Sequence, residues 1–264
     1  MVSMARQGAN ASEDSSIPAL ERAAFAAWPA ARVLDVDGWK LRLTGGMTRR
    51  ANSVWPLQAR GQLEVEARID AVERHYRREG LPVRLQITGA AVPADLDARL
   101  EARGYAVESP VAIAVAKVAA VAGLGPAPAH FEAEVLRAPD ARWLAVSADG
   151  GRFAEARPHY EALLARIGQR ARFALACREG QPLAVGLGVC DGDLFGVFSM
   201  LTLPEARRQG AGRTVLAALA KSARAAGATQ LYLQVGRDNR AALSLYQAAG
   251  FRERYGYHYR RLDP

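Results

Sequence analysis

The sequence has little cysteine and no long apolar run. It contains two cysteines in 264 residues, and because Cys177 and Cys190 lack the spacing of metal ligands or of a redox pair, we expect both to be unpaired side chains in a reducing compartment. No stretch approaches the ~20 apolar residues that a membrane helix needs, and residues 1–16 hold no apolar signal-peptide core. These absences favour a soluble, cytoplasmic protein with no membrane partner and with a disordered tail at 1–16.

The sequence also lacks clustered positive charge. The formal net charge is +8, but no run of five or more basic residues occurs and no basic stripe is interleaved with aromatic residues. The basic residues are nearly all arginines scattered through Ala/Arg-rich segments. We therefore expect no nucleic-acid partner, although the charge is compatible with a local phosphate site.

Helical and strand patterns alternate through the first half of the chain. Turn pairs such as Asp37-Gly38 and stops such as Gly80 separate segments of period two from segments of period near 3.6. The predicted elements are a helix at 17–29, a hairpin at 32–45, a strand at 51–57, a helix at 64–78, a strand at 83–88, a helix at 94–103 and one or two strands at 105–118.

A stretch rich in Ala, Gly and Pro, at 119–130, shows no periodicity and predicts a linker between two domains, 17–118 and 131–264. The elements predicted beyond it are a helix at 154–167, strands at 172–178, 183–190 and 194–203, a helix at 210–226, a strand at 230–235, a helix at 240–249 and a strand at 252–260. Strands that alternate with helices indicate an α/β (α+β) fold in which helices cover the faces of a sheet.

The two halves show a weak internal repeat. Leu-Gln-Ile at 85–87 aligns with Leu-Gln-Val at 233–235, and to within two residues Gly-Tyr at 104–105 aligns with Gly-Phe at 250–251. Residues 58–63 then align with 207–212. The repeat favours a duplication of one fold.

Residues 199–212 form the most informative segment, in which a strand runs through a proline into a basic, glycine-bearing turn that begins a helix. Unpaired amides at a helix start, together with the positive end of its dipole, bind phosphate well. Gly210 and Gly212 allow close approach of an anion. Val215 stands where a dinucleotide-binding fingerprint needs a third glycine, so the segment does not fit an NAD site. The alternative is a helix start that uses glycine and arginine by chance.

Several motifs together resemble the GCN5-related N-acetyltransferase (GNAT) family over about residues 172–260. They are Leu201-Thr202-Leu203-Pro204, Arg207-x-x-Gly210-x-Gly212, Asn239, Tyr246 and Gly250-Phe251. The resemblance implies that the motif strand is bulged and splayed, so that its backbone near Leu201, Thr202 and Leu203 binds the pantetheine arm of acetyl-CoA. It also implies a pyrophosphate site and a further contact to the cofactor arm from Asn239. The residues implied for the pyrophosphate site are Arg208, Gln209, Gly210, Ala211, Gly212 and Arg213, and Arg207 adds positive charge beside them.

Tyr246 is the candidate general acid, because acetyl transfer leaves a thiolate that a phenol can protonate. The alternative for Tyr246 is a packed aromatic side chain. No carboxylate lies within the motif strand, so the base is unassigned; Glu205 lies at the turn, and Ser199 can only orient a water or the substrate. His159 and His258 are candidate relays or ordinary surface residues.

The first half is predicted to be a degenerate lobe. Leu63 replaces the last glycine of the turn and Leu100 stands in the place of Tyr246, so neither an anion site nor an acid is retained. The elements at 38–42 and 48–53 resemble a bacterial group of two-lobed GNAT proteins. This resemblance implies two GNAT-like lobes, each with a mixed, mostly antiparallel sheet flanked by helices. Polar side chains there are candidates for binding an acceptor carboxylate, or else cap turns and join the lobes; they are Arg49, Arg50, Asn52 and Ser53.

The predicted function is acetyl transfer from acetyl-CoA to a primary amine of a small molecule, amino acid or protein terminus. The alternative is a non-catalytic CoA-sensing or interaction module, which the missing carboxylate base and the degenerate lobe favour. Turnover in the presence of an amine distinguishes the two.

Overall fold

The computed structural model describes residues 16–125, 130–149 and 153–264. The predicted tail therefore lies outside the described residues except for Ser16, whose side chain caps the first helix by accepting a hydrogen bond from the backbone amide of Ala19. Residues 126–129 of the predicted linker also lie outside them.

One continuous sheet runs through the described part of the chain, with the strand order β1-β2-β3-β4-β11-β5-β10-β9-β8-β7-β6. Neighbouring strands are antiparallel except for the parallel pairs β3–β4 and β9–β10. The strands are β1 (Arg32–Val36), β2 (Trp39–Leu43), β3 (Val54–Trp55), β4 (Val83–Ile87), β5 (Ala106–Lys117), β6 (Glu132–Leu136), β7 (Ala171–Arg178), β8 (Gln181–Asp191), β9 (Leu194–Thr202), β10 (Gln230–Gly236) and β11 (Arg252–Leu262).

Helices cover both faces of this sheet. The α-helices are α1 (Ile17–Ala27), α2 (Val65–Arg78), α3 (Leu96–Ala102), α4 (Val118–Ala122), α5 (Ala141–Leu144), α6 (Arg157–Ile167), α7 (Ala211–Ala225) and α8 (Arg240–Ala248). Short turns of other helix types are η1 (Arg49–Ala51), η2 (Ala145–Asp149), η3 (Gly168–Arg170) and η4 (Pro204–Ala206). The predicted mixed α/β fold with a mostly antiparallel sheet is confirmed.

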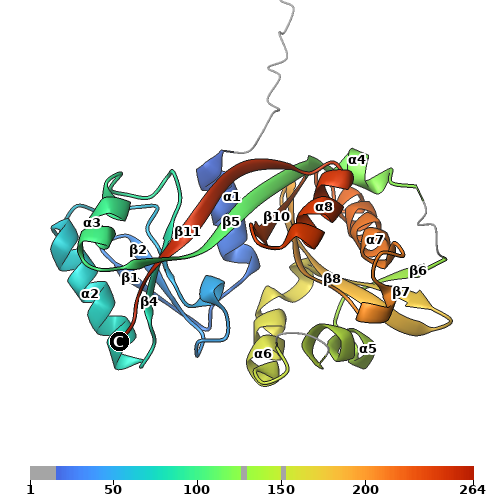
Figure 1. The fold of residues 1–264 in the computed structure, drawn as a ribbon, viewed down its shortest axis with the longest axis horizontal. Helices are drawn as coiled ribbons and strands as arrows, with labels where there is room; N and C mark the ends of the chain where they lie inside the picture. Colours follow the sequence, from blue (N-terminus) through green and yellow to red (C-terminus); the bar gives the residue numbers. More distant parts are fainter. Residues whose placement is uncertain (1–15, 126–129, 150–152) are drawn as a thin grey trace, which may run out of the picture.

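The order of elements repeats between the halves, and the last strand of each half crosses to the other. The first half runs α2-β4-α3-β5 and the second α7-β10-α8-β11. Strand β5 pairs with β10 of the second half, and β11 pairs with β4 of the first. Figure 1 shows these two long strands running side by side between the lobes, where Arg252 to Arg261 align with Val115 to Ala106. Backbone hydrogen bonds thus join the lobes into one sheet.

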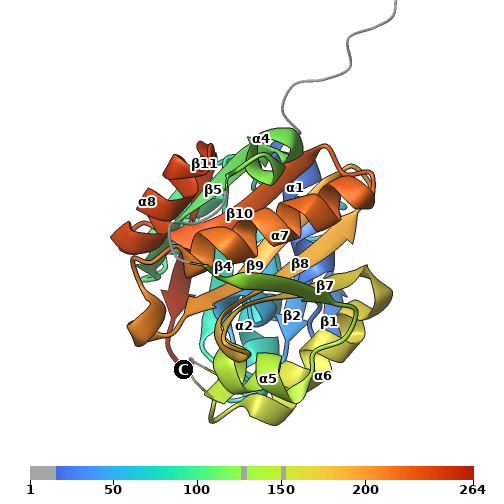
Figure 2. The same ribbon diagram turned by 90° about the vertical axis from the view of Figure 1, so that its right-hand side faces the viewer.

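Three apolar cores hold the helices on the sheet. On the part of the sheet formed by the second-half strands, α4, α7 and α8 pack on one face and α1 and α6 pack on the other, as Figure 2 shows for α7 and α6. In the first half, α2 presents the fully buried Ile69, Val72 and Tyr76 to the strands, as its helical period predicts. Helix α1 lies early in the sequence but contacts β8 and β9.

Some predicted elements differ from the structure. The strand expected at 51–57 shortens to β3, because η1 forms the approach to it. The segment 118–122 is helical, and it buries Val118 and Val121 against α7. Strand β6 and helix α5 were not predicted, since β6 is a largely exposed edge strand with no apolar alternation. Cys177 and Cys190 lie in β7 and β8 and are unpaired, as expected.

Candidate functional site

Strand β9 carries a bulge near its end. Val185 of β8 is opposite Leu201, whereas Leu187 is opposite Phe198, so β9 holds an extra residue between these pairs. Ser199 has a positive φ of 46°, as a residue in a bulge can. The parallel register with β10 ends at Val197 opposite Leu233. Beyond this point the two strands separate, and the β10-facing edge of β9 has no register partner within the described residues.

A basic turn follows and begins helix α7. Arg208 has a φ of 62° and Gly210 a φ of 98°, a backbone conformation that glycine adopts without strain. Gly210 is the N-cap and has no side chain with which to cap the helix. The amides of Ala211, Gly212 and Arg213 therefore lack intrahelical acceptors, and the first helical hydrogen bond runs from Thr214 N to Gly210 O at 2.9 Å.

Gly212 brings the start of α7 close to two other elements. A β-carbon at this position would lie 3.2 Å from Thr202 Oγ1 and 3.3 Å from a methyl group of Leu245. The glycine therefore serves close packing between α7, β9 and α8, in addition to the approach of an anion inferred from the sequence.

Side chains around the turn divide into bonded and free groups. Gln209 is held inside the turn, because its Oε1 accepts from Arg178 Nη2 at 2.5 Å and its Nε2 donates to Glu205 O at 2.6 Å. Arg207 Nε donates to Thr202 O at 3.2 Å, and Arg208 is exposed. The Nε of Arg213 is buried without a hydrogen-bond partner. A buried donor without an acceptor is costly, which suits an anion-binding position.

The corresponding turn of the first half contains an internal anion. The carboxylate of Asp37 accepts hydrogen bonds of 3.2 Å from the amides of both Gln62 and Leu63, just before α2. It also pairs with the buried guanidinium of Arg68, whose Nε lies 3.0 Å from Asp37 Oδ2. Burial alone would raise the pKa of Asp37, but the amide of Leu63 and the guanidinium lower the pKa below its ordinary value. The amides of Gln62 and Leu63, which precede the N-cap of α2, therefore bind a carboxylate of the chain itself.

Tyr246 lies on α8 and is 8% exposed. Its ring packs against Phe251 at a centroid distance of 5.8 Å, and both lie in the core beneath α7 and α8. Burial raises the pKa of the Tyr246 phenol to about 12, so the hydroxyl keeps its proton at neutral pH. Leu100 of α3 is fully buried in the first lobe and supplies no hydroxyl.

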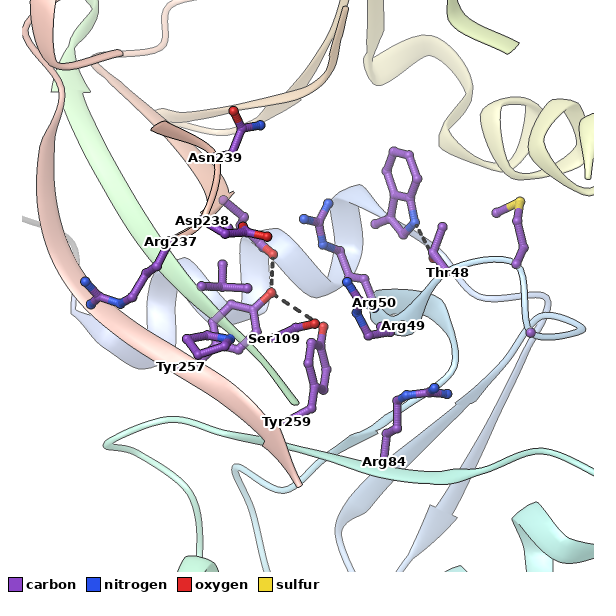
Figure 3. A pocket seen from close by; sticks show the side chains of 17 residues that line it. Thr48, Arg49, Arg50, Arg84, Ser109, Arg237, Asp238, Asn239, Tyr257 and Tyr259 are labelled. Carbon is purple, nitrogen blue, oxygen red and sulfur yellow. Dashed lines mark hydrogen bonds between the residues drawn. The ribbon is translucent and has the colours of Figure 1, made fainter. Parts of the chain in front are cut away.

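A cavity of about 1070 Å³ lies between the lobes, on the sheet face opposite Tyr246. Gln234 and Gly236 of β10 line it, while the intervening Val235 faces the Tyr246 core, as strand alternation requires. Figure 3 shows arginines of the first half facing Asp238, Tyr257 and Tyr259 across this space. The lining residues are Trp28, Gly46, Met47, Thr48, Arg49, Arg50, Arg84, Ser109, Pro110, Val111, Gln234, Gly236, Arg237, Asp238, Asn239, Tyr257 and Tyr259.

The four polar candidates of the first half divide into two pairs. Arg49 and Arg50 line the cavity. Asn52 is buried and ties its own loop, since its Oδ1 accepts from Thr44 N at 2.7 Å and from Gly46 N at 3.1 Å. Ser53 is fully buried and its Oγ accepts from Arg42 Nη2 at 2.7 Å. The buried pair thus orders the loop that carries the two arginines.

Ser199 and Asn239 lie at the two separating strands. Ser199 Oγ accepts from the hydroxyl of Tyr160 on α6 at 2.9 Å, which fixes the bulge. Asn239 caps α8, because its Oδ1 accepts from Ala242 N at 3.1 Å, and it also lines the cavity.

Other titratable candidates lie outside the cavity. Glu205 and His159 are exposed, and His258 Nε2 lies 2.9 Å from Asp97 Oδ1. Asp238 was missed from the sequence, although it directly precedes Asn239, and it is the one acidic side chain among the described residues that line the cavity. Within the described residues no group of three or more His, Cys, Asp or Glu side chains is placed to hold a metal. The same part of the chain holds no helix long and apolar enough to cross a membrane.

Comparison with known proteins gives consistent matches. Residues 14–260 match the family model described as "Probable histone acetyltransferase Rv0428c C-terminal". An uncharacterized N-acetyltransferase of Bacillus subtilis, YobR, is 30% identical over 245 residues, which cover 91% of this chain and 96% of the relative.

Solved structures share the fold at low sequence identity. A GCN5-related N-acetyltransferase from Kribbella flavida superposes with a TM-score of 0.66 at 18% identity, covering 89% of this chain and 90% of that one. A functionally unknown conserved protein from Staphylococcus epidermidis gives 0.65 at 10% identity, with 92% and 96% covered. A tandem GNAT protein from the clavulanic acid biosynthesis pathway gives 0.60 at 16% identity, with 78% and 73% covered.

Proposed function

The chain belongs to the acetyltransferase family represented by Rv0428c, within the GCN5-related N-acetyltransferases, and we propose that it transfers an acetyl group from acetyl-CoA to a primary amine in the cytoplasm. Its second half is the proposed catalytic domain and its first half a degenerate lobe that walls the acceptor cavity. The observation that carries the proposal is the separation of β9 from β10 at the Ser199 bulge, directly before the free amides of α7.

The donor site is proposed from the β10-facing edge of β9 and from the start of α7. Backbone groups near Leu201 and Thr202 at the end of β9 would take the pantetheine arm as a neighbouring strand would. Leu203 is not available for this, because its amide donates to Leu183 O at 2.9 Å and its carbonyl accepts from Ala206 N at 3.0 Å. The amides of Ala211 and Gly212, with the unpaired Nε of Arg213, would take the pyrophosphate.

The chemistry requires a proton to leave the amine and another to reach the sulfur. Acetyl-CoA supplies an activated thioester. Transfer of its acetyl group to the amine forms an amide and releases the thiol of CoA. Tyr246 is the proposed donor of the proton to sulfur, because burial keeps its hydroxyl protonated. Since Tyr246 lies on the sheet face opposite the cavity, it would reach the sulfur through the gap between β9 and β10. Asp238 is the proposed acceptor of the proton from the amine, because it is the carboxylate of the cavity.

Calorimetry with acetyl-CoA tests the donor site. Gly210→Val should weaken binding by about tenfold or more, because valine resists the positive φ and crowds the amides. Arg224→Gln, at the far end of α7, is the matched control and should bind as the wild type does. Folding of each variant is checked by circular dichroism. Wild-type affinity in a folded Gly210→Val protein would refute the site.

Thiol release with a panel of primary amines tests the reaction. Acetyl-CoA binding accompanied by amine-dependent thiol release supports the proposal. Binding without release from any amine would instead favour a CoA-sensing module.

A further inference from the structure

Two opposite charges line the interlobe cavity without pairing. Arg50 comes from η1 of the first lobe and Asp238 from the loop between β10 and α8. Within the described residues, neither side chain has a salt bridge within 4.0 Å or a hydrogen bond. Figure 3 shows both directed into the same space.

Arg50 packs against aromatic rings, and no carboxylate of the described residues lies within salt-bridge distance of it. Its guanidinium carbon lies 5.5 Å from the ring centroid of Trp28 and 5.3 Å from that of Phe198. Trp28 is itself fixed, because its Nε1 donates to Thr48 Oγ1 at 3.2 Å. The Nε of Arg50 is buried and has no acceptor. A guanidinium has five N–H donors suited to a carboxylate, and those of Arg50 form no hydrogen bond with any described residue.

The other cations of the cavity already have carboxylate partners. Arg84 Nε lies 2.7 Å from Glu108 Oε2, and the more exposed Arg49 lies 3.6 Å from the other oxygen of Glu108. Arg237 pairs with Glu253. Among the described cavity residues, Arg50 is therefore the cation left for a ligand.

Arg50 lies next to the point where β9 and β10 separate, which is the proposed place of reaction. Phe198, against which its guanidinium packs, directly precedes the Ser199 bulge where β9 leaves β10. Asp238 follows the end of β10, on the other side of that separation. A small acceptor that touched both charges would thus lie beside the gap between the strands.

From this geometry we propose that the cavity selects an acceptor carrying a carboxylate as well as its amine, with Arg50 binding the carboxylate and Asp238 facing the amine. The proposal rests on the proposed acetyl transfer for the role of the amine. An amino acid meets the requirement, whereas an amine without an anion, such as an amino-acid amide, does not.

Nuclear magnetic resonance of the Arg50 Nε–H group tests carboxylate binding without any donor present. The resonance is assigned by its loss in Arg50→Lys. Glycine, L-alanine, L-phenylalanine and L-glutamate are titrated, each against its amide. We expect the resonance to shift in a saturable way with at least one acid. The affinity derived from this titration should be at least about tenfold higher for the acid than for its amide. No shift with any acid, or equal shifts with acid and amide, would overturn the proposal.

Thiol-release kinetics with the same pairs give a second readout. The wild type should prefer the acid through KM, and Arg50→Gln should reduce this preference to near equality while leaving the affinity for acetyl-CoA unchanged. Asp238→Asn should slow acid and amide alike. Arg224→Gln should behave as the wild type does. An unchanged preference in Arg50→Gln would contradict the proposal. If the wild type did not bind acetyl-CoA at all, this would contradict the donor site alone.

Discussion

The carboxylate of Asp37 accepts a hydrogen bond of 3.2 Å from the backbone amide of Leu63, directly before helix α2. Asp37 belongs to the β1–β2 turn, so the contact joins residues from separate elements. In the second lobe the aligned turn lies among arginines and ends in Gly212. The turn before α2 thus binds an internal carboxylate, whereas the turn that begins α7 is the proposed site of an external anion.

Replacing Asp37 by asparagine should destabilise the protein at neutral pH. The change leaves Arg68 buried without a charged partner. Because the pKa of Asp37 is lowered in the folded state, its contribution is present above the ordinary value of 3.8 and is lost as the pH falls through the folded value. Urea unfolding should therefore show a large difference between variant and wild type at pH 7 that shrinks on acidification. The exposed Asp263→Asn is the control, and an equally small effect of both changes would contradict the prediction.

Arg213→Gln should weaken acetyl-CoA binding by about 10- to 100-fold, the range expected when a charge-assisted hydrogen bond is lost. Its Nε is buried and has no hydrogen-bond partner among the described residues, and it lies in the first turn of α7. The substitution therefore removes a donor and a charge that none of those residues uses. Calorimetry at two salt concentrations measures the affinity and its salt dependence. Arg224→Gln controls for net charge; if it weakens binding as much as Arg213→Gln does, the local effect is refuted.

Tyr246→Phe should lower kcat by about 10²- to 10⁴-fold and change the affinity for acetyl-CoA little. The ring packs against Phe251, so phenylalanine keeps the packing and removes only the hydroxyl. With a phenol pKa of about 12, ionisation of Tyr246 should cause no loss of wild-type activity up to about pH 10. Stopped-assay kinetics across this range check both points. Unchanged kcat in the variant would exclude the acid role.

Glu21→Gln should change how stability depends on pH. Glu21 of α1 is 1% exposed and accepts hydrogen bonds from Trp55 Nε1, Gln86 Nε2 and Tyr255 Oη. Burial raises its pKa above 4.5, and the hydrogen bonds from Tyr255 and Trp55 oppose this only in part. The folded state therefore binds the proton more tightly than the unfolded state, and the contribution of Glu21 is greatest below pH 4.5 and declines as the pH rises through the folded value.

Glutamine retains the shape and carries no charge at any pH. The difference in the free energy of unfolding between Glu21→Gln and wild type should therefore move in favour of the variant between pH 4.5 and pH 8, as followed by urea denaturation. A difference independent of pH in that interval would show that burial does not perturb Glu21.

Local chemistry in the sequence was enough to predict most elements. The Asp37-Gly38 pair predicted the first hairpin, and the β-rich run before Pro204 with Gly210 beyond it predicted the turn that begins α7. These features depend on neighbours within a few residues, through backbone dihedral preferences and the periodicity of apolar side chains. Residues of the donor turn adjoin one another for the same reason, so they could be named before the fold was known.

Contacts across the chain were decided by the tertiary structure alone. The crossing of β5 and β11 between lobes depends on which distant strand each of them pairs with. The alternation of apolar and polar residues along a strand does not identify that partner. Arg50 was predicted from the sequence as a candidate, but its packing against Trp28 and Phe198 was not. Asp238 could be identified only from the tertiary structure, which places the loop after β10 and η1 around one cavity. The sequence by itself determined the elements and the anion-binding turn, whereas the fold determined which charges find partners, because pairing requires proximity in space rather than along the chain.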